Sequence, residues 1–390
     1  MYKSLISLAL GTFGLGMAEF VMMGILPDIA KSMSISIPTA GHFISLYALG
    51  VAFGAIVLVF AARKQPLKSI LLVLVSIHII GNVLTSIAPN YYVMLVTRFI
   101  SGLPHGGFFG IGAIVAGKLA GKGRESHAVA VMVAGMTIAN LIGIPLGTFI
   151  SHNISWRVLF LLISLFGFFI FAAIKKWIPY FDPMPDNGVS GQFRFLKNTA
   201  PWLLLFAIVF GNGGIFCWFS YINPVLVKVS GFAASKVSSL MIVAGAGMCC
   251  GNLVAGKIAD KYTPAKVAAY TQLIAALALV LVFFFAQNPY ISVGLMFLGA
   301  FCLFALSAPQ QVLLIENSPG GEILGAAASQ MAFNIGNALG AYLGGLPPEF
   351  GLGYQYTALP GAVLAFIGFI LIMIFRKKYA NKNIVDFDKS

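Results

Sequence analysis

Charged side chains are scarce in this chain of 390 residues. Only 9% of the residues are Asp, Glu, Lys or Arg, whereas soluble domains carry about 25%. Acidic residues are the rarest, with 11 against 24 basic residues. This composition excludes an ordinary soluble domain and indicates a protein whose surface lies largely in lipid.

Signatures of enzymatic chemistry are also missing. Cysteine occurs four times, and Cys249-Cys250 has no metal-ligand spacing and no matching His cluster. No HExxH, GxSxG or P-loop pattern occurs. No polar stretch is long enough for a nucleotide-binding domain. We therefore expect neither an enzyme nor a metal or cofactor site, and no direct use of ATP.

Hydrophobic residues, in contrast, make up 59% of the chain. They form runs of about 20 residues, each long enough to cross a hydrocarbon core of about 30 Å. Backbone groups in lipid must be satisfied within the segment, which favours helices. The sequence therefore predicts an all-α integral membrane protein. The twelve predicted transmembrane helices cover residues 5–27, 39–61, 69–88, 92–116, 126–150, 156–177, 199–222, 237–258, 265–286, 291–315, 322–346 and 354–375.

The basic residues predict the orientation of these helices. If both termini are cytoplasmic, 19 of the 24 Lys and Arg residues lie at or beyond the cytoplasmic ends of the helices, four lie at or beyond the outer ends, and only Arg98 lies well within a span. Cytoplasmic loops of membrane proteins carry this excess of basic residues. The net charge of +13 is then explained by orientation and by contact with anionic lipid, so no nucleic-acid partner is expected.

The chain also contains an internal repeat. The longest polar stretch between predicted helices, residues 179–198, lies after the sixth, and a shift of 197 residues superposes special positions of the two halves. The matches are Gly14 with Gly211, Pro27 with Pro224, Asn140 with Asn337, Gly143 with Gly340, and Gly147 with Gly344. We therefore predict two pseudo-symmetric six-helix bundles, residues 1–178 and 199–390, joined by a cytoplasmic linker at 179–198. This layout is typical of rocker-switch transporters, which bind a solute at mid-membrane.

Several short motifs resemble those of the major facilitator superfamily. The loop motif Gly-x-x-x-Asp-Arg/Lys is present as Gly256-Lys-Ile-Ala-Asp260-Lys261, while the first-half copy keeps only Arg63 and Lys68. The family's Arg-x-x-x-Gly motif corresponds to Arg98-Phe-Ile-Ser-Gly102. In the family, the Asp helps to latch helices together at the cytoplasmic face, so the resemblance implies a weaker latch in the first half.

The predicted fifth helix carries Gly143-Ile-Pro145-Leu-Gly147, which is similar to the Gly-Pro-x-x-Gly motif of proton-coupled exporters but has one residue inserted. The runs LALGTFGLGMAEF, YALGV, SGLPHGGFFGIGAI, GMTIANLIGIPLGT and LFALSAP resemble the arabinose-inducible, sugar-efflux-permease-like branch of the drug:proton antiporters. This resemblance implies a monomer in a bacterial inner membrane that exports a sugar or an amphipathic drug by alternating access, driven by the proton gradient. Proton-coupled uptake and passive transport of sugars or nucleosides stay open as alternatives.

Charged residues within the predicted helices are the candidate proton-coupling groups. Glu19 is the one acidic residue near the middle of a span, and a charge there costs at least about 2.5–3.5 kcal/mol, so it is functional by default. Counted along their helices, Glu19 and Arg98 lie at depths that agree to within a few Å. Arg98 keeps its proton and is expected to bias a carboxylate or to bind the solute. His105, two turns beyond Arg98, is a candidate relay or a packed hydrogen-bonding group.

The second half has no charged residue near the middle of its predicted helices but carries neutral polar and aromatic side chains. Asn and Gln beside aromatic rings suit a solute rich in hydroxyl groups, although each of them can equally join neighbouring helices. The candidate solute-binding residues are Asn212, Trp218, Tyr221, Asn223, Gln310, Gln311, Gln330 and Asn334. We therefore expect protons to be handled in the first half and the solute to be held largely in the second.

Overall fold

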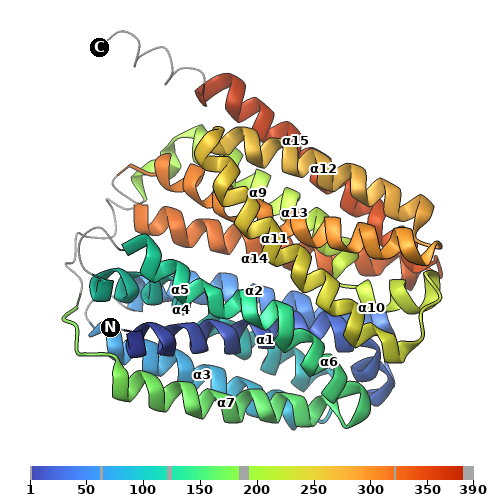
Figure 1. Ribbon diagram of the computed structural model, residues 1–390, viewed down its shortest axis with the longest axis horizontal. Helices are drawn as coiled ribbons and strands as arrows, with labels where there is room; N and C mark the ends of the chain where they lie inside the picture. The colour runs from blue at the N-terminus through green and yellow to red at the C-terminus, as the bar shows by residue number, and fades with distance from the viewer. Residues whose placement is uncertain (1, 62–64, 121–124, 184–192, 320–321, 381–390) are drawn as a thin grey trace. The chain divides into compact units, whose positions relative to one another are not determined.

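The computed structural model describes residues 2–61, 65–120, 125–183, 193–319 and 322–380 (Figure 1). These residues form helices, turns and loops, with no strand among them, which confirms the predicted all-α class. In the first half the helices are α1 (Tyr2–Ser32), α2 (Ile37–Ala61), α3 (Leu67–Ser86), α4 (Tyr91–Ala120), α5 (Glu125–Ile138), α6 (Ile144–Asn153) and α7 (Trp156–Trp177). In the second half they are α9 (Thr199–Phe219), α10 (Ile222–Pro224), α11 (Val237–Lys261), α12 (Pro264–Phe285), α13 (Pro289–Glu316), α14 (Glu322–Glu349) and α15 (Ala358–Phe375).

Length and composition identify the membrane spans. Among the described residues, eleven helical segments are long and apolar enough to cross a membrane, with α5 and α6 counted together. The one further long helix, α14, has 28 residues and includes the amide residues Gln330, Asn334 and Asn337. Its length matches that of the other spans, so the protein is a multi-pass membrane protein.

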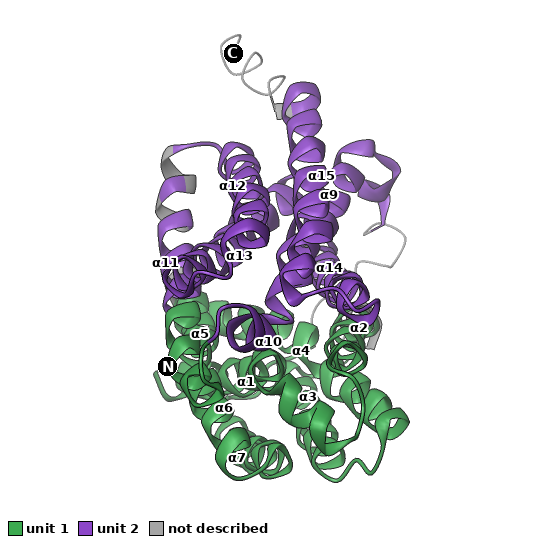
Figure 2. Cartoon of the chain, turned by 90° about the vertical axis from the view of Figure 1, so that its right-hand side faces the viewer, with its two compact units in different colours: residues 1–187, 232–245 green, residues 188–231, 246–390 purple. Residues whose placement is uncertain are grey.

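The chain divides into two compact units, coloured separately in Figure 2. The first comprises residues 1–187 and 232–245, and the second comprises residues 188–231 and 246–390. In the first unit α2 packs on α4, α3 packs on α4 and α7, and α1 packs on α5 and α7. In the second unit α9 packs on α14 and α15, and α12 packs on α13 and α15. The first nine residues of α11 group with the first unit, so the boundaries proposed from the repeat stay a prediction.

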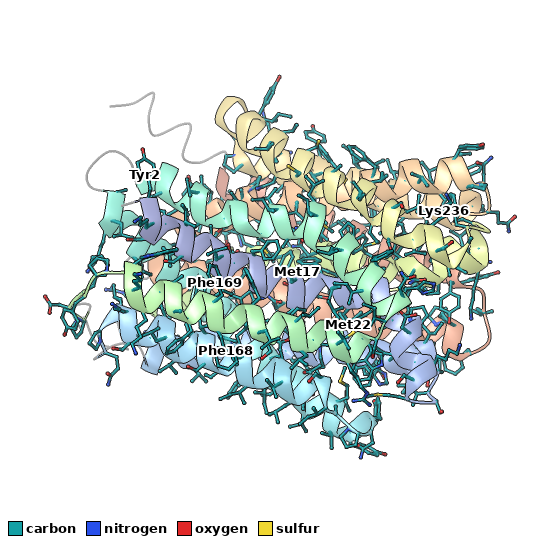
Figure 3. The ribbon with its side chains drawn as sticks, turned by 60° about the horizontal axis from the view of Figure 1, so that its bottom comes forward. Tyr2, Met17, Met22, Phe168, Phe169 and Lys236 are labelled. Carbon is teal, nitrogen blue, oxygen red and sulfur yellow. The ribbon has the colours of Figure 1, made fainter. Side chains whose placement is uncertain are left out.

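Exposure separates the outer and inner faces of the first unit. Phe168 and Phe169 on α7 have exposed fractions of 57% and 54%, whereas Met17 and Met22 on α1 are buried (Figure 3). Large apolar side chains left exposed in this way suit contact with lipid tails. The side chains of α1 instead form part of the interior of the unit, where the candidate site lies.

The predicted helix 126–150 is interrupted in the structure. A π-turn at Ala139–Gly143 separates α5 from α6, and within it the Ile144 amide donates to the Ala139 carbonyl. Pro145 follows directly and has no amide hydrogen, so the regular ladder of hydrogen bonds cannot continue through it. The interruption of the predicted helix 126–150 therefore has a local cause, the missing amide hydrogen of Pro145.

Close contact between α2 and α4 depends on glycine. A Cβ on Gly102 of α4 would overlap the carbonyl oxygen of Tyr47 and lie 3.0 Å from the Val51 amide nitrogen, both on α2. Gly110, two turns further along α4, has nothing within 4 Å of its Cβ position. The two glycines therefore form a matched pair for a substitution test.

Gly102→Ala is expected to lower the free energy of unfolding by about 1–3 kcal/mol, because the helices must separate to admit the methyl group. Gly110→Ala should leave it unchanged or raise it by up to about 1 kcal/mol, the difference in helix propensity. Thermal unfolding of the purified variants measures both effects. Equal losses in the two variants would show that close approach at Gly102 is not what holds α2 against α4.

Candidate functional site

Glu19 lies in the interior of the first unit. It occupies the middle of α1 and its side chain is only 3% exposed. One of its carboxylate oxygens, Oε2, is 3.6 Å from Nε2 of His105 on α4, and His105 is fully buried. This distance is slightly longer than a hydrogen bond, so a shift of a few tenths of an ångström would close it.

His105 is connected on its other side to Tyr47. Nδ1 of His105 and the Tyr47 hydroxyl are 3.0 Å apart, and both side chains are buried. If Tyr47 donates to Nδ1, the ring proton resides on Nε2 and points towards an ionised Glu19. The other tautomer leaves Nε2 as an acceptor for a protonated Glu19. A change of tautomer therefore lets His105 accommodate both protonation states of Glu19.

Arg98 packs against the same tyrosine. Its guanidinium carbon lies 4.3 Å from the centre of the Tyr47 ring, and its Nη2 donates to the Ala18 carbonyl at 3.0 Å. The same guanidinium carbon lies 5.4 Å from the centre of the Phe160 ring on α7. Within the described part of the chain, Nε and Nη1 have no hydrogen-bond partner, although Arg98 is fully buried. A buried cation with unused donors is costly unless a nearby negative charge compensates it.

The predicted coupling residues thus belong to one buried cluster, which we call the α1–α2–α4 cluster and define as Glu19, Tyr47, Arg98 and His105. Tyr47 joins the other three, since it contacts both the His105 ring and the Arg98 guanidinium. The sequence analysis missed Tyr47. Its position within a predicted span, in the run YALGV, was the available signal, but the chain has 13 tyrosines and their contacts cannot be read from spacing.

In the second unit, two of the predicted solute-binding residues meet. Nδ2 of Asn212 on α9 donates to Oε1 of Gln310 on α13 at 2.9 Å, and also to the Ile208 carbonyl at 3.1 Å. Both side chains are buried. The remaining amide atoms, Oδ1 of Asn212 and Nε2 of Gln310, have no hydrogen-bond partner among the described residues. The pair therefore retains one acceptor and one donor that a solute hydroxyl can use.

The other predicted residues of the second unit have varied surroundings. The Tyr221 hydroxyl donates to the Ala341 carbonyl at 2.8 Å, and Nδ2 of Asn334 donates to the Gln330 carbonyl at 2.9 Å, so both join backbone groups. Trp218 is buried and packs at Gly299, and its Nε1 has no acceptor within the described part of the chain. Asn223 is buried, Gln330 is half-buried and Gln311 is exposed. Their role in solute binding stays a prediction.

The described residues of the predicted conformational motifs lie at three places in the fold. Gly143 and Gly147 face α1, where added Cβ atoms would meet Met17 and Val21, and Pro145 lies between them. Lys68 lies at the start of α3. The backbone of Gly256, Asp260 and Lys261 belongs to the end of α11, but their side chains, like the whole of Arg63, lie outside the described residues. The predicted latch therefore stays a prediction.

Known proteins match this chain over most of its length. A family model described as Major Facilitator Superfamily matches residues 8–329. A protein of Escherichia coli (strain K12) named "Putative transporter AraJ" is 46% identical over 375 residues, which cover 96% of this chain and 95% of that protein. A "Probable sugar efflux transporter" of Helicobacter acinonychis is 25% identical over 347 residues, covering 89% of this chain and 88% of its own.

Among solved structures, the crystal structure of a D-xylose-proton symporter resembles this chain with a TM-score of 0.73. The match covers 94% of this chain and 97% of the symporter at 15% sequence identity. At that identity the likeness shows the fold alone.

Proposed function

This chain belongs to the major facilitator superfamily, and because it is therefore a membrane transporter and not an enzyme, we propose that it exports a small polar solute in exchange for protons. The proton gradient supplies the energy, and no cofactor takes part. The protein works as a monomer in the inner membrane of a bacterium, with both termini in the cytoplasm. Alternating access then exposes the binding groups to each side of the membrane in turn.

The α1–α2–α4 cluster is the observation on which the proton coupling rests. Placing a buried carboxylic acid in a membrane interior costs free energy, so such a residue is a functional candidate by default. Glu19 has a histidine 3.6 Å away that can follow its protonation through a change of tautomer. Arg98, held against Tyr47, supplies a permanent positive charge. In the proposed cycle Glu19 takes up a proton on one side of the membrane and releases it on the other.

The Asn212–Gln310 pair supports a solute with hydroxyl groups. A hydroxyl can donate to the Asn212 oxygen and accept from the Gln310 nitrogen, which satisfies both unused atoms. The relative from Helicobacter acinonychis is named as a sugar efflux transporter, and this agrees with a sugar or an amphipathic molecule bearing polar groups. We propose that Asn212 and Gln310, with Trp218, Tyr221, Asn223, Gln311, Gln330 and Asn334, hold this solute.

Purified protein in proteoliposomes tests direction and coupling together. The vesicles are loaded in parallel with D-xylose, uridine or ethidium, and an inward proton gradient is imposed while a trapped pH dye reports proton entry. Proton-coupled export predicts solute release that is faster with the gradient than without it, and proton entry that depends on the solute. Protein-free vesicles are the control.

Other results favour the alternatives. Solute accumulation driven by the same gradient would indicate uptake by symport. Flux that equalises the solute without proton movement would indicate a passive facilitator, and Glu19 would then have no coupling role.

A further inference from the structure

Asn140 is a buried polar residue that the proposed cycle does not use. It lies in the π-turn between α5 and α6 and is only 1% exposed. Neither its Oδ1 nor its Nδ2 has a hydrogen-bond partner among the described residues. A buried amide in this state costs about 1–3 kcal/mol for each unsatisfied group, so a further hydrogen-bonding partner is expected for it.

The backbone around Asn140 does not require this side chain. The π-turn is accounted for by Pro145, which lacks an amide hydrogen, and by the bond from the Ile144 amide to the Ala139 carbonyl. A Cβ on Gly245 of α11 would overlap the Asn140 carbonyl, so the backbone is also held tightly from that side. The side-chain amide contributes no bond to any of this. Its polarity is therefore not explained by the local structure.

The equivalent position in the second half, Asn337, also shows that the asparagine side chain does not determine the backbone conformation. Asn337 occupies the position equivalent to Asn140, but α14 runs through it without a π-turn. Tyr342, at the position equivalent to Pro145, carries the amide hydrogen that Pro145 lacks. An asparagine at this position is thus not enough to produce a π-turn. π-turns within long helices are frequent at functional sites.

We propose that the Asn140 side chain is a further solute-binding group, which takes one hydroxyl of the transported solute as donor to Oδ1 and acceptor from Nδ2. The proposal rests on the proposed transport function for the existence of such a solute, but not on its direction or on proton coupling. An ordered water offers the same chemistry, and the experiments must distinguish it from the solute. A group that binds the solute has to become reachable from water during the cycle, whereas one that holds a trapped water does not.

Cysteine labelling in vesicles tests this accessibility without knowledge of the solute. The four native cysteines, Cys217, Cys249, Cys250 and Cys302, are first replaced by Ser. Asn140→Cys is then treated with the cationic reagent 2-(trimethylammonium)ethyl methanethiosulfonate. Ala139→Cys is the matched control, because Ala139 is buried in the same turn but packs against α1 at Gly16. We expect labelling at position 140 to be about tenfold faster or more, and equal rates at the two positions would overturn the proposal.

Asn140→Leu provides a second test that does not depend on the cysteine variant. Leucine has the same branched heavy-atom skeleton as asparagine and removes two unsatisfied groups, so the melting temperature should be unchanged or higher. In solute exchange measured at equal pH on the two sides of the vesicle membrane, the KM should rise by about tenfold, which corresponds to about 1.4 kcal/mol. A lower melting temperature with an unchanged KM would show that the amide holds a structural water, and it would overturn the proposal. If Glu19 proves to have no coupling role, these outcomes keep their meaning, since neither depends on a proton gradient.

Discussion

Glu19→Gln is expected to lower solute flux driven by a pH gradient by about 100-fold or more, the scale on which a positioned acid–base group contributes. Glutamine has nearly the same shape and can still face His105, so solute binding should stay close to that of the wild type. It cannot take up and release a proton, and the gradient then has no group through which to act. Gradient-driven flux and solute exchange at equal pH, measured on the same proteoliposomes, separate these two effects.

The matched control is Glu349→Gln, which makes the same change at an exposed position near the end of α14. It should leave both forms of flux unchanged. Gradient-driven flux that persists in Glu19→Gln would remove this residue from the coupling role. Loss of exchange together with gradient-driven flux would instead point to a defect in solute binding or in the conformational change.

Arg98→Leu is expected to lower the free energy of unfolding by about 3–5 kcal/mol, the usual cost of leaving a buried charge without its partner. Glu19→Gln removes the opposite charge. The two changes together should therefore cost less than the sum of the single losses, by about 1 kcal/mol or more. Thermal or denaturant unfolding of the wild type, both single variants and the double variant measures this coupling.

Arg157 provides the control for this cycle. Like Arg98, it donates to a backbone carbonyl, that of Ser86 at 2.9 Å, and lies 4.3 Å from an aromatic ring, that of Trp156. It is half-buried and is not part of the α1–α2–α4 cluster. A cycle of Arg157→Leu with Glu19→Gln should be additive. If the losses of unfolding free energy are additive for Arg98 and Glu19 as well, Arg98 contributes through its backbone and ring contacts and does not interact with Glu19.

Two features of the site could be predicted because they depend on local composition. Glu19 and Arg98 stood out because a charge within an apolar run is expensive and rare. Their depths followed from the constant rise of a helix, and the structure places both in the same cluster. The amide residues of the second half were recognisable because polar side chains are also rare within apolar runs. Two of them, Asn212 and Gln310, are in direct contact.

Other features could not be predicted, because they depend on which helix faces which. Tyr47 connects His105 with Arg98 only because Gly102 lets α4 approach the backbone of α2 closely. Asn140 stood out in the sequence only as a repeat match, and its side chain is set apart by having no hydrogen-bond partner among the residues that the structure describes. Gly143, Pro145 and Gly147 suggested a bend in the predicted helix 126–150, but the apolar pattern continues through Pro145 and does not predict the π-turn between α5 and α6.

The sequence by itself determined the class of the protein, its helices and the residues that carry charge into the membrane. These follow from the length of apolar segments and from the cost of placing charges in lipid, and both are properties of single segments. The tertiary structure decided which side chains meet: Glu19 with His105, Tyr47 with Arg98, and Asn212 with Gln310. Lipid is as apolar as the helix surfaces, so neighbouring helices are selected by close packing and hydrogen bonds between segments far apart in the chain.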